Sequence, residues 1–322
     1  MSTNETNDIS KITISIVLII KNGEEYMRYL DEIFGNQQEQ KYDYMFYIYE
    51  NNSTDKTKME IENFFLKRPD KCKYLMENVS HNLNLSGISI ERGTYMAKLR
   101  NKLKDFHGTL DSTYTIIIDC DVLFSHDIID EALNVFKTHP NVAAVTAFDV
   151  CWYQYVNHNS IHYYDTLALI TENNYRNTQC IFSSCISCRK DRALNKICDE
   201  KILLSNNKII NVNSAFGGFL LIKTDIYNQV KWENNDVCEH HSFCKNIKKF
   251  GNIVINSNIN VITTVPAIRN YNAIQSSLVQ FNSKSDSVTQ NAAAYLNKKI
   301  IHKKIIQKKR IHKKIHLNII YN

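Results

Sequence analysis

The first half of the chain alternates apolar runs of strand length with stretches of helical spacing. Four runs are short enough to be single strands: "ITISIVLII" (12–20), "YDYMFYIYE" (42–50), "CKYLME" (72–77) and "YTIIID" (114–119). Between them, residues 23–36 and 92–106 place apolar and aromatic side chains three and four positions apart, as on one face of a helix. Strands bounded by helices in this way predict βαβ units, and therefore a mainly parallel sheet with helices on both faces.

The second half of the sequence has a less regular pattern. "NVAAVTAF" (141–148) and "SAFGGFLLIKT" (214–224) predict strands, and "GNIVINSNINVITT" (251–264) predicts one strand or a pair. Long polar stretches lie between them. We therefore expect an α/β fold whose second half is elaborated and mixed.

The composition is that of a folded protein. The 322 residues are 43% hydrophobic and 11% aromatic, which excludes wholesale disorder, and only 8 Gly and 3 Pro are present. No segment has the composition of a linker between two domains. We predict one domain over residues 1–297, with a first half at 12–125 and a second half at 140–275, followed by a basic tail at 298–322.

The net charge of +6 belongs to that tail. Residues 298–322 carry nine Lys or Arg and no acid, so +6 less +9 leaves −3 for the rest of the chain. The basic pairs recur every five residues, a step that spreads charge around a helix and leaves no apolar stripe. Two interpretations stay open: a solvated extension, or peripheral contact with an anionic membrane surface. We expect no specific nucleic-acid partner.

The nine cysteines form no obvious disulfide framework, and the apolar run at 12–20 is too short to span a bilayer. No basic segment precedes that run, so we expect no signal peptide, a cytoplasmic location and reduced thiols. A zinc site is the alternative use of the cysteines. It would combine "CEHHSFC" at 238–244 with four further cysteines: Cys180, Cys185, Cys188 and Cys198.

Two aspartates follow the fourth predicted strand. Asp119 ends the run and Asp121 comes after one intervening cysteine. At this spacing the two side chains point the same way if the strand continues, and two carboxylates on one face repel each other unless a cation lies beside them. A divalent metal is the usual cation, so the pair predicts a metal site. The competing interpretation is an ordinary polar strand end.

Polar residues also follow the first two predicted strands, at the edge where ligands of parallel sheets bind. Lys21 and Asn22 come after the first strand, and Glu50 ends the second. The Glu50 carboxylate can accept hydrogen bonds from a ribose or base, and a solvated strand end is an equally good interpretation. Arg100, on the helix before the two aspartates, can brace a phosphate or nucleobase, or can lie on the surface.

The segment "DVCEHHSFC" (236–244) concentrates a carboxylate and two imidazoles. Glu239 can deprotonate an acceptor hydroxyl, or it can steady positive charge on a transferred group. Neutral imidazole is an acceptable metal ligand, so His240 or His241 could complete the metal site. The competing interpretation for His241 is a packed histidine, which we adopt.

The ordered set of motifs resembles the GT-A glycosyltransferases. It comprises an opening strand, an acid at the end of the second strand followed by "NNSTDKT", an "LRN" helix and "IIIDCDV". "ERGTYMAKLRNKL", "YYDTLAL", "FGGFLLIK" and "CEHHSFC" are similar to segments of the fungal capsule-associated α-1,3-mannosyltransferases and of related viral and bacterial enzymes. The resemblance covers roughly residues 12–265. In one departure, the arginine-rich run that the family carries before the "LRN" helix is reduced here to Arg92.

The resemblance implies a transferase that moves a hexose, with mannose favoured, from a nucleotide-diphosphate sugar to an acceptor hydroxyl. The implied site comprises Glu239 for catalysis; Asn22, Glu50, Arg100 and Asp119 for a GDP- or UDP-linked donor; Asp165 and Gly218 for a glycan or protein acceptor; and Asp119, Asp121 and His240 for Mn²⁺, with Mg²⁺ as the alternative metal. Within the metal set, the resemblance gives direct ligation to Asp121. The alternative function is a non-catalytic or zinc-stabilised binding protein whose basic tail holds an anionic partner.

Overall fold

The computed structural model describes residues 11–35, 41–80, 89–124, 127–151, 163, 165, 167–174, 209–233 and 236–263. In the first half its elements are β1 (Thr13–Ile20), α1 (Glu24–Ile33), β2 (Asp43–Asn51), α3 (Thr57–Leu66), β3 (Cys72–Glu77), α4 (Ile90–His107) and β4 (Tyr114–Asp119). In the second half they are β5 (Val122–Phe124), α5 (Ile128–Thr138), β6 (Val142–Cys151), β7 (Ile170–Thr171), β8 (Ile209–Ser214), β9 (Phe219–Lys223), α10 (Thr224–Gln229), α11 (Glu239–Ile247) and β10 (Asn252–Thr263).

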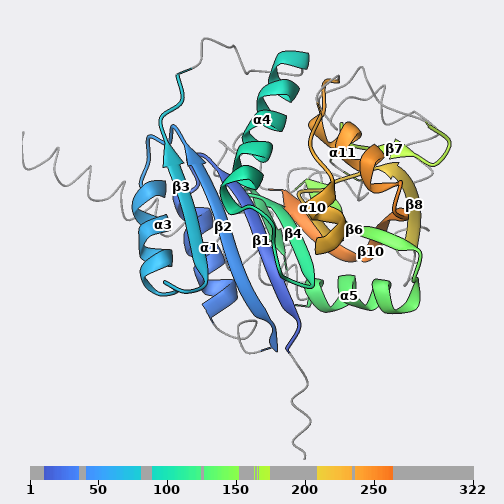
Figure 1. Cartoon of the computed structure of the whole chain (residues 1–322), viewed down its shortest axis with the longest axis horizontal. Helices are drawn as coiled ribbons and strands as arrows, with labels where there is room; N and C mark the ends of the chain where they lie inside the picture. Colours follow the sequence, from blue (N-terminus) through green and yellow to red (C-terminus); the bar gives the residue numbers. More distant parts are fainter. Residues whose placement is uncertain are drawn as a thin grey trace, which may run out of the picture.

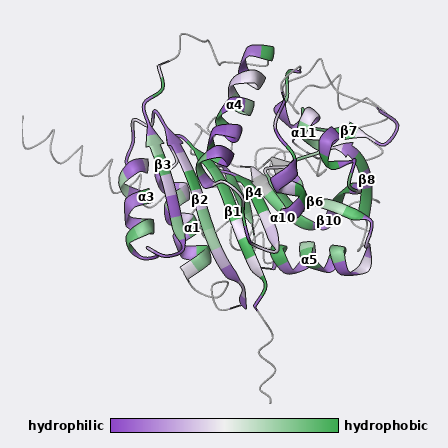
Figure 2. Cartoon of the chain, viewed as in Figure 1, coloured by the Kyte–Doolittle hydropathy of each residue, from purple (hydrophilic) through white to green (hydrophobic). Residues whose placement is uncertain are grey.

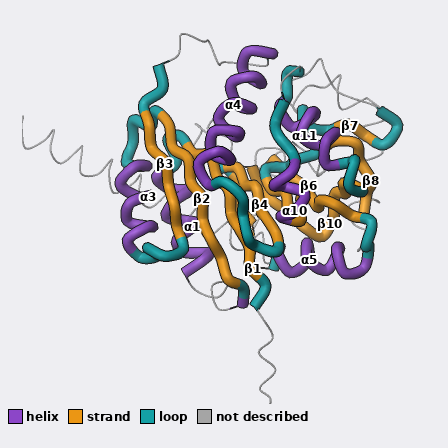
Figure 3. Tube along the Cα trace, in the orientation of Figure 1, coloured by secondary structure: helices purple, strands orange, loops and turns teal. Residues whose placement is uncertain are grey.

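The described strands join in one sheet in the order β3-β2-β1-β4-β9-β6-β10-β8-β7, with β5 paired to β10. Figure 3 shows β3, β2, β1 and β4 side by side in the first half of this order. The first four strands of this order are parallel, because β1 pairs in parallel with both β2 and β4, and β2 with β3. β9 then lies antiparallel between β4 and β6, and β8 lies antiparallel to β10. The parallel first half and the mixed second half confirm the fold class predicted from the periodicities.

Helices cover both faces of the sheet, as predicted (Figure 1). On one face, α1, α3 and α5 pack in an apolar cluster with Ile14, Ile16 and Leu18 of β1. On the other face, α4, α10 and α11 pack in a second cluster that includes Val17 of the same strand. One continuous apolar run supplies both clusters because successive side chains of a strand point to opposite faces. In Figure 2 the covering helices carry hydrophilic and hydrophobic residues side by side, as helices with one buried face do.

One strand prediction in the second half needs correction, and one open alternative is decided. Residues 214–224 are not a single strand, because the chain turns between β8 and β9 at Gly217 and Gly218. These glycines have φ angles of +61° and +67°, which L side chains rarely adopt and which a strand cannot contain. Residues 251–264 hold one strand, β10, whose pairing with β6 shifts register in its middle.

Candidate functional site

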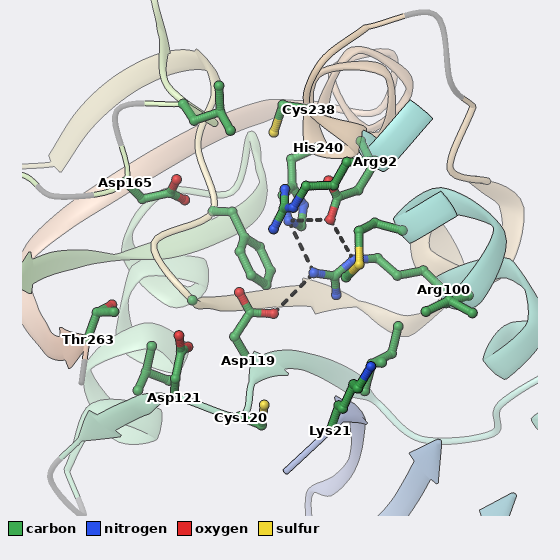
Figure 4. Close-up of a pocket in the computed structure, with 18 of the residues that line it drawn as sticks. Lys21, Arg92, Arg100, Asp119, Cys120, Asp121, Asp165, Cys238, His240 and Thr263 are labelled. Atoms are coloured by element: carbon green, nitrogen blue, oxygen red, sulfur yellow. Dashed lines mark hydrogen bonds and ion pairs between the residues drawn. The ribbon is translucent and has the colours of Figure 1, made fainter. Parts of the chain in front are cut away.

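A cavity of about 480 Å³ opens where β1 and β4 end (Figure 4). Its walls come from α4, the turn before β9, the first residues of α11 and the last residue of β10. The cavity therefore lies where parallel strands meet an antiparallel one, the kind of crevice in which open α/β sheets bind ligands. Seven of the nine predicted site residues line it: Arg100, Asp119, Asp121, Asp165, Gly218, Glu239 and His240.

The other two predicted residues, Asn22 and Glu50, lie outside the lining and hold two loops together. The Asn22 backbone N donates to Ser53 Oγ at 2.9 Å, and Asn22 Oδ1 accepts from Thr54 N at 2.8 Å. Glu50 Oε1 accepts from Ser53 N at 2.7 Å. Because Glu50 is 0% exposed, its interpretation as a solvated strand end is wrong. Both side chains fix the loops that follow β1 and β2. The adjacent residues Lys21 and Asn51 line the cavity instead.

Asp119 and Asp121 both face the cavity (Figure 4). β4 ends at Asp119, whose backbone N donates to Gly218 O at 2.9 Å. A side chain at Gly218 would not fit beside β5, since its Cβ would lie 2.2 Å from Val122 Cγ1. Gly218 therefore lets the turn before β9 lie directly against the end of β4. This turn forms part of the cavity wall beside Asp119 and Asp121.

Arg100 joins Asp119 to Glu239. The Arg100 side chain is buried, its Nε donates to Glu239 Oε1 at 3.1 Å, and its Nη2 donates to Asp119 Oδ1 at 3.1 Å. Burial by itself lowers the pKa of the guanidinium, but Asp119 and Glu239 raise it by more, so the pKa is raised and the side chain stays charged. The surface interpretation of Arg100 is therefore wrong.

His240 is buried beside Arg100 and is neutral. Its Nε2 lies 3.3 Å from Arg100 Nη2, and because guanidinium nitrogens only donate, Nε2 is the acceptor and Nδ1 carries the hydrogen. Burial lowers the pKa of His240 well below its usual value, and the Arg100 charge lowers it further. The imidazole stacks on the Phe216 ring with centroids 3.9 Å apart. Within the described structure, Nδ1 is buried with no hydrogen-bond partner.

Two partly exposed carboxyl groups lie on the side of the cavity opposite Arg100, where Figure 4 shows Asp121 and Asp165. Burial raises the pKa of Asp121 to about 7, and the charges of Asp119 and Asp165 add to the rise. Burial also raises the pKa of Asp165 to about 6, although its Oδ2 accepts from Gly217 N at 3.0 Å. Burial and the neighbouring acids therefore both disfavour the charged form of these two carboxyl groups.

Asp149 is a further lining residue that was not predicted from the sequence. It lies in β6, is 1% exposed, and accepts from Thr263 Oγ1 at 2.7 Å through its Oδ1. Burial raises its pKa well above the usual value, as do the neighbouring acids, of which Asp165 has the largest effect. The one available signal was an aspartate directly after the apolar run of β6.

The cavity holds carboxylates of the kind that bind a divalent cation. Among the residues that the structure describes, five acids line the cavity, against three basic side chains, Lys21, Arg92 and Arg100. Among the described residues, no three His, Cys, Asp or Glu side chains are already arranged to hold a metal ion. Hard cations such as Mg²⁺ are usually held by one or two carboxylates together with substrate phosphates, so Asp119 and Asp121 suffice on the protein side.

The zinc alternative can be followed only in part. Four of its cysteines lie outside the described residues: Cys180, Cys185, Cys188 and Cys198. Cys238 and Cys244 are buried free thiols. His241 Nδ1 lies 2.9 Å from Asp236 Oδ2, and its Nε2 lies 2.8 Å from Leu167 O, as expected for the packed histidine.

The predicted membrane contact cannot be followed, because the tail at 298–322 lies outside the described residues. In the described part of the chain, no helix is both long enough and apolar enough to cross a bilayer.

Comparison with known proteins gives similar folds only. No protein-family model and no curated protein match the sequence. Staphylococcus aureus TarS 1-349 has a TM-score of 0.44 and 13% identity, covering 87% of this chain and 68% of that one. The mannosyltransferase PcManGT of Pyrobaculum calidifontis, solved with GDP-Man and Mn²⁺, has a TM-score of 0.44 and 11% identity, covering 88% and 69%. GalNAc-T7, solved with UDP, GalNAc and Mn²⁺, has a TM-score of 0.44 and 11% identity, covering 80% and 44%. At these values the activity has to be inferred from the site itself.

Proposed function

We propose that the chain is a metal-dependent glycosyltransferase of the GT-A type, which transfers a hexose from a GDP- or UDP-linked donor to an acceptor hydroxyl. The observation that carries the proposal is that Asp119, Asp121 and Glu239 line one cavity at the carboxyl ends of β1 and β4. Asp119 and Asp121 are suited to bind a metal, and Glu239 is suited to accept a proton. A protein that only binds a ligand does not need this combination in one cavity. Mannose is favoured by the sequence resemblance alone.

On the donor side, the cavity has the size and the charges for a nucleotide diphosphate. About 480 Å³ lies within the range of small-molecule sites, and Lys21 and Arg92 line it as cations for phosphate oxygens. When bound, Mn²⁺ or Mg²⁺ would neutralise the negative charge that builds on the departing diphosphate. Asp121 would ligate it directly, and Asp119 would use Oδ2 towards the ribose or a metal-bound water, because its Oδ1 accepts from Arg100.

His240 is the proposed third metal ligand, and its geometry sets a condition for that role. Among the described residues, no hydrogen-bond partner contacts Nδ1, which carries the hydrogen while Arg100 donates to Nε2. Ligation through Nδ1 therefore requires that hydrogen to move to Nε2, whose neighbouring carboxylate oxygen is Glu239 Oε1 at 3.4 Å.

On the acceptor side, Glu239 would take the proton of the attacking hydroxyl. The acceptor oxygen forms a bond to C1 of the sugar, and the bond from C1 to the phosphate oxygen breaks with its electron pair left on the nucleoside diphosphate. Glu239 Oε1 is held by Arg100, so Oε2 is the oxygen that would receive the proton. In a reaction that retains configuration, Glu239 would steady the positive charge on the sugar instead. Asp165 and Gly218 are proposed for the acceptor, glycan or protein.

The proposal is tested by screening nucleotide sugars by NMR with Mn²⁺, observing which donor is consumed and which anomer forms. GDP or UDP with Mn²⁺ should also raise the melting temperature, since a ligand at 100 times its Kd adds about 2.7 kcal/mol of stability. Asp121→Asn should abolish donor consumption, and the exposed Asp70→Asn is the matched control. A protein that is stabilised by neither nucleotide and consumes no donor would leave the binding-protein alternative.

A further inference from the structure

Arg100 is fixed by contacts with side chains from two other elements and a turn. Besides Asp119 at the end of β4 and Glu239 at the start of α11, its guanidinium carbon lies 5.2 Å from the centroid of the Phe216 ring, in the turn before β9. The guanidinium therefore lies between Asp119, on the proposed sugar-donor side, and Glu239, on the proposed sugar-acceptor side, and Figure 4 shows its contact with Asp119. Its Nε and Nη2 are both taken by carboxylate oxygens of this chain, and Nη2 also contacts His240.

The next residue on α4 strengthens this arrangement. Asn101 Nδ2 donates to Trp232 O at 2.7 Å, and Trp232 N donates to Asn101 Oδ1 at 3.2 Å. The Trp232 ring stacks on Phe243 of α11 with centroids 3.9 Å apart, and its centroid lies 6.0 Å from the Arg100 guanidinium carbon. Asn101 therefore holds the Trp232 backbone before α11, and the adjacent Arg100 holds the Glu239 carboxylate at the start of α11.

We propose that Arg100 is a positioning residue, which holds Asp119 and Glu239 in one geometry and does not itself bind the donor. This inference rests on the proposed function, and it replaces the expectation that Arg100 braces a phosphate or nucleobase. A guanidinium suits the task because its planar fork donates in fixed directions, one nitrogen to each carboxylate. The cavity keeps two other cations, Lys21 and Arg92, for anionic groups of a ligand.

Arg100→Met removes the fork and keeps most of the length of the side chain, and Arg100→Lys keeps the charge but loses the fork. Because Arg100→Met removes a buried, paired cation, its matched control must do the same elsewhere. Arg68→Met meets this condition, because Arg68 is 9% exposed, donates to Asp31 Oδ1 at 2.8 Å, lies 4.2 Å from the Phe64 ring centroid and does not line the cavity. Circular dichroism establishes which variants fold.

The first measurement needs no activity. In full-length protein freed of metal with EDTA, ¹⁵N NMR of His240, assigned by its absence in His240→Asn, should show the Nδ1–H tautomer, because Arg100 donates to Nε2. In Arg100→Met the hydrogen should move to Nε2, for which Glu239 Oε1 at 3.4 Å is then the available acceptor. Arg68→Met should leave the tautomer unchanged. The same tautomer in wild type and Arg100→Met would overturn the proposal.

The second measurement is a double-mutant cycle on the affinity for GDP and for UDP, each with Mn²⁺. Losing a partner that orients a metal-binding group typically costs about 10–100-fold in affinity, so Arg100→Met and Arg100→Lys should weaken binding by that factor. In an Asp119→Asn background the further loss should fall to within about twofold, because Arg100 acts through Asp119. An equal loss in both backgrounds would mean that Arg100 contacts the nucleotide directly and would overturn the proposal. If the wild type binds neither nucleotide, the proposed function fails, and the tautomer still decides the role of Arg100.

Discussion

Replacing Asp121 with asparagine should stabilise the metal-free protein while abolishing its metal-dependent nucleotide binding. The carboxyl group lines the cavity among other acids, with Asp119 and Asp165 as the charged neighbours that raise its pKa. In the absence of a cation this charge is unfavourable in the folded state. The amide removes the charge and keeps the shape, so the two properties should change in opposite directions.

The size of the stabilisation follows from the pKa. Burial first, and then Asp119 and Asp165, raise the pKa of Asp121 from 3.8 to about 7. Its destabilising effect therefore begins as the pH rises above the unfolded value and is complete above the folded value. About three pKa units at about 1.36 kcal/mol each set a ceiling of about 4 kcal/mol. Because the side chain is partly exposed, solvent screening reduces the expected gain to about 1–2 kcal/mol.

The assay is urea unfolding of both proteins at about pH 7.5 with EDTA, followed by thermal unfolding with Mn²⁺ and GDP or UDP. Asp121→Asn should raise the free energy of unfolding in the first experiment and show no nucleotide-dependent shift in the second. Asp70→Asn, on the surface, should stay within about 0.5 kcal/mol of wild type and keep the nucleotide shift. An asparagine variant that is less stable without metal, or that keeps the Mn²⁺-dependent shift, would refute the reasoning.

Three further predictions concern other parts of the molecule. Glu239→Gln should lower donor turnover by about 10²–10⁴-fold while the affinity for nucleotide persists, measured by NMR and titration; lost nucleotide binding would place Glu239 on the donor side. Burial lowers the pKa of Lys104, which donates to the Tyr227 and Val230 carbonyls, to about 8. Because the unfolded chain keeps that proton to higher pH, the free energy of unfolding of the wild type should rise by about 2 kcal/mol relative to Lys104→Met between about pH 7.5 and 9.5. Urea unfolding measures this difference, and parallel pH profiles of the two proteins would contradict it. Deleting residues 298–322 should leave donor consumption unchanged and reduce flotation with anionic liposomes at low salt; equal flotation would identify the tail as a solvated extension.

The sequence by itself determined the parallel half of the fold and the position of the two aspartates. Both depend on local periodicity: a continuous apolar run is a strand buried on both faces, and a helix between two such runs places them in parallel. β1 lies within its predicted run, β2 is displaced from its run by one residue at each end, and β3 and β4 coincide with theirs. β4 ends at Asp119 and Asp121 lies in the turn before β5, so the expected alternation does not extend to Asp121, but both aspartates lie at the carboxyl end of the buried strand as the apolar run predicted.

Only the tertiary structure decided what surrounds them. β9 enters antiparallel between β4 and β6, and both pairings join segments far apart in the sequence, which no local pattern encodes. This arrangement brings α11 to α4, so that Arg100 is buried between Asp119 and Glu239, where the sequence also allowed a surface side chain. It also encloses Asp149, while Glu50 turns away to fix a loop. The residue type sets which chemistry a side chain can perform, but its neighbours across the fold set its charge, its burial and the atoms left for a ligand.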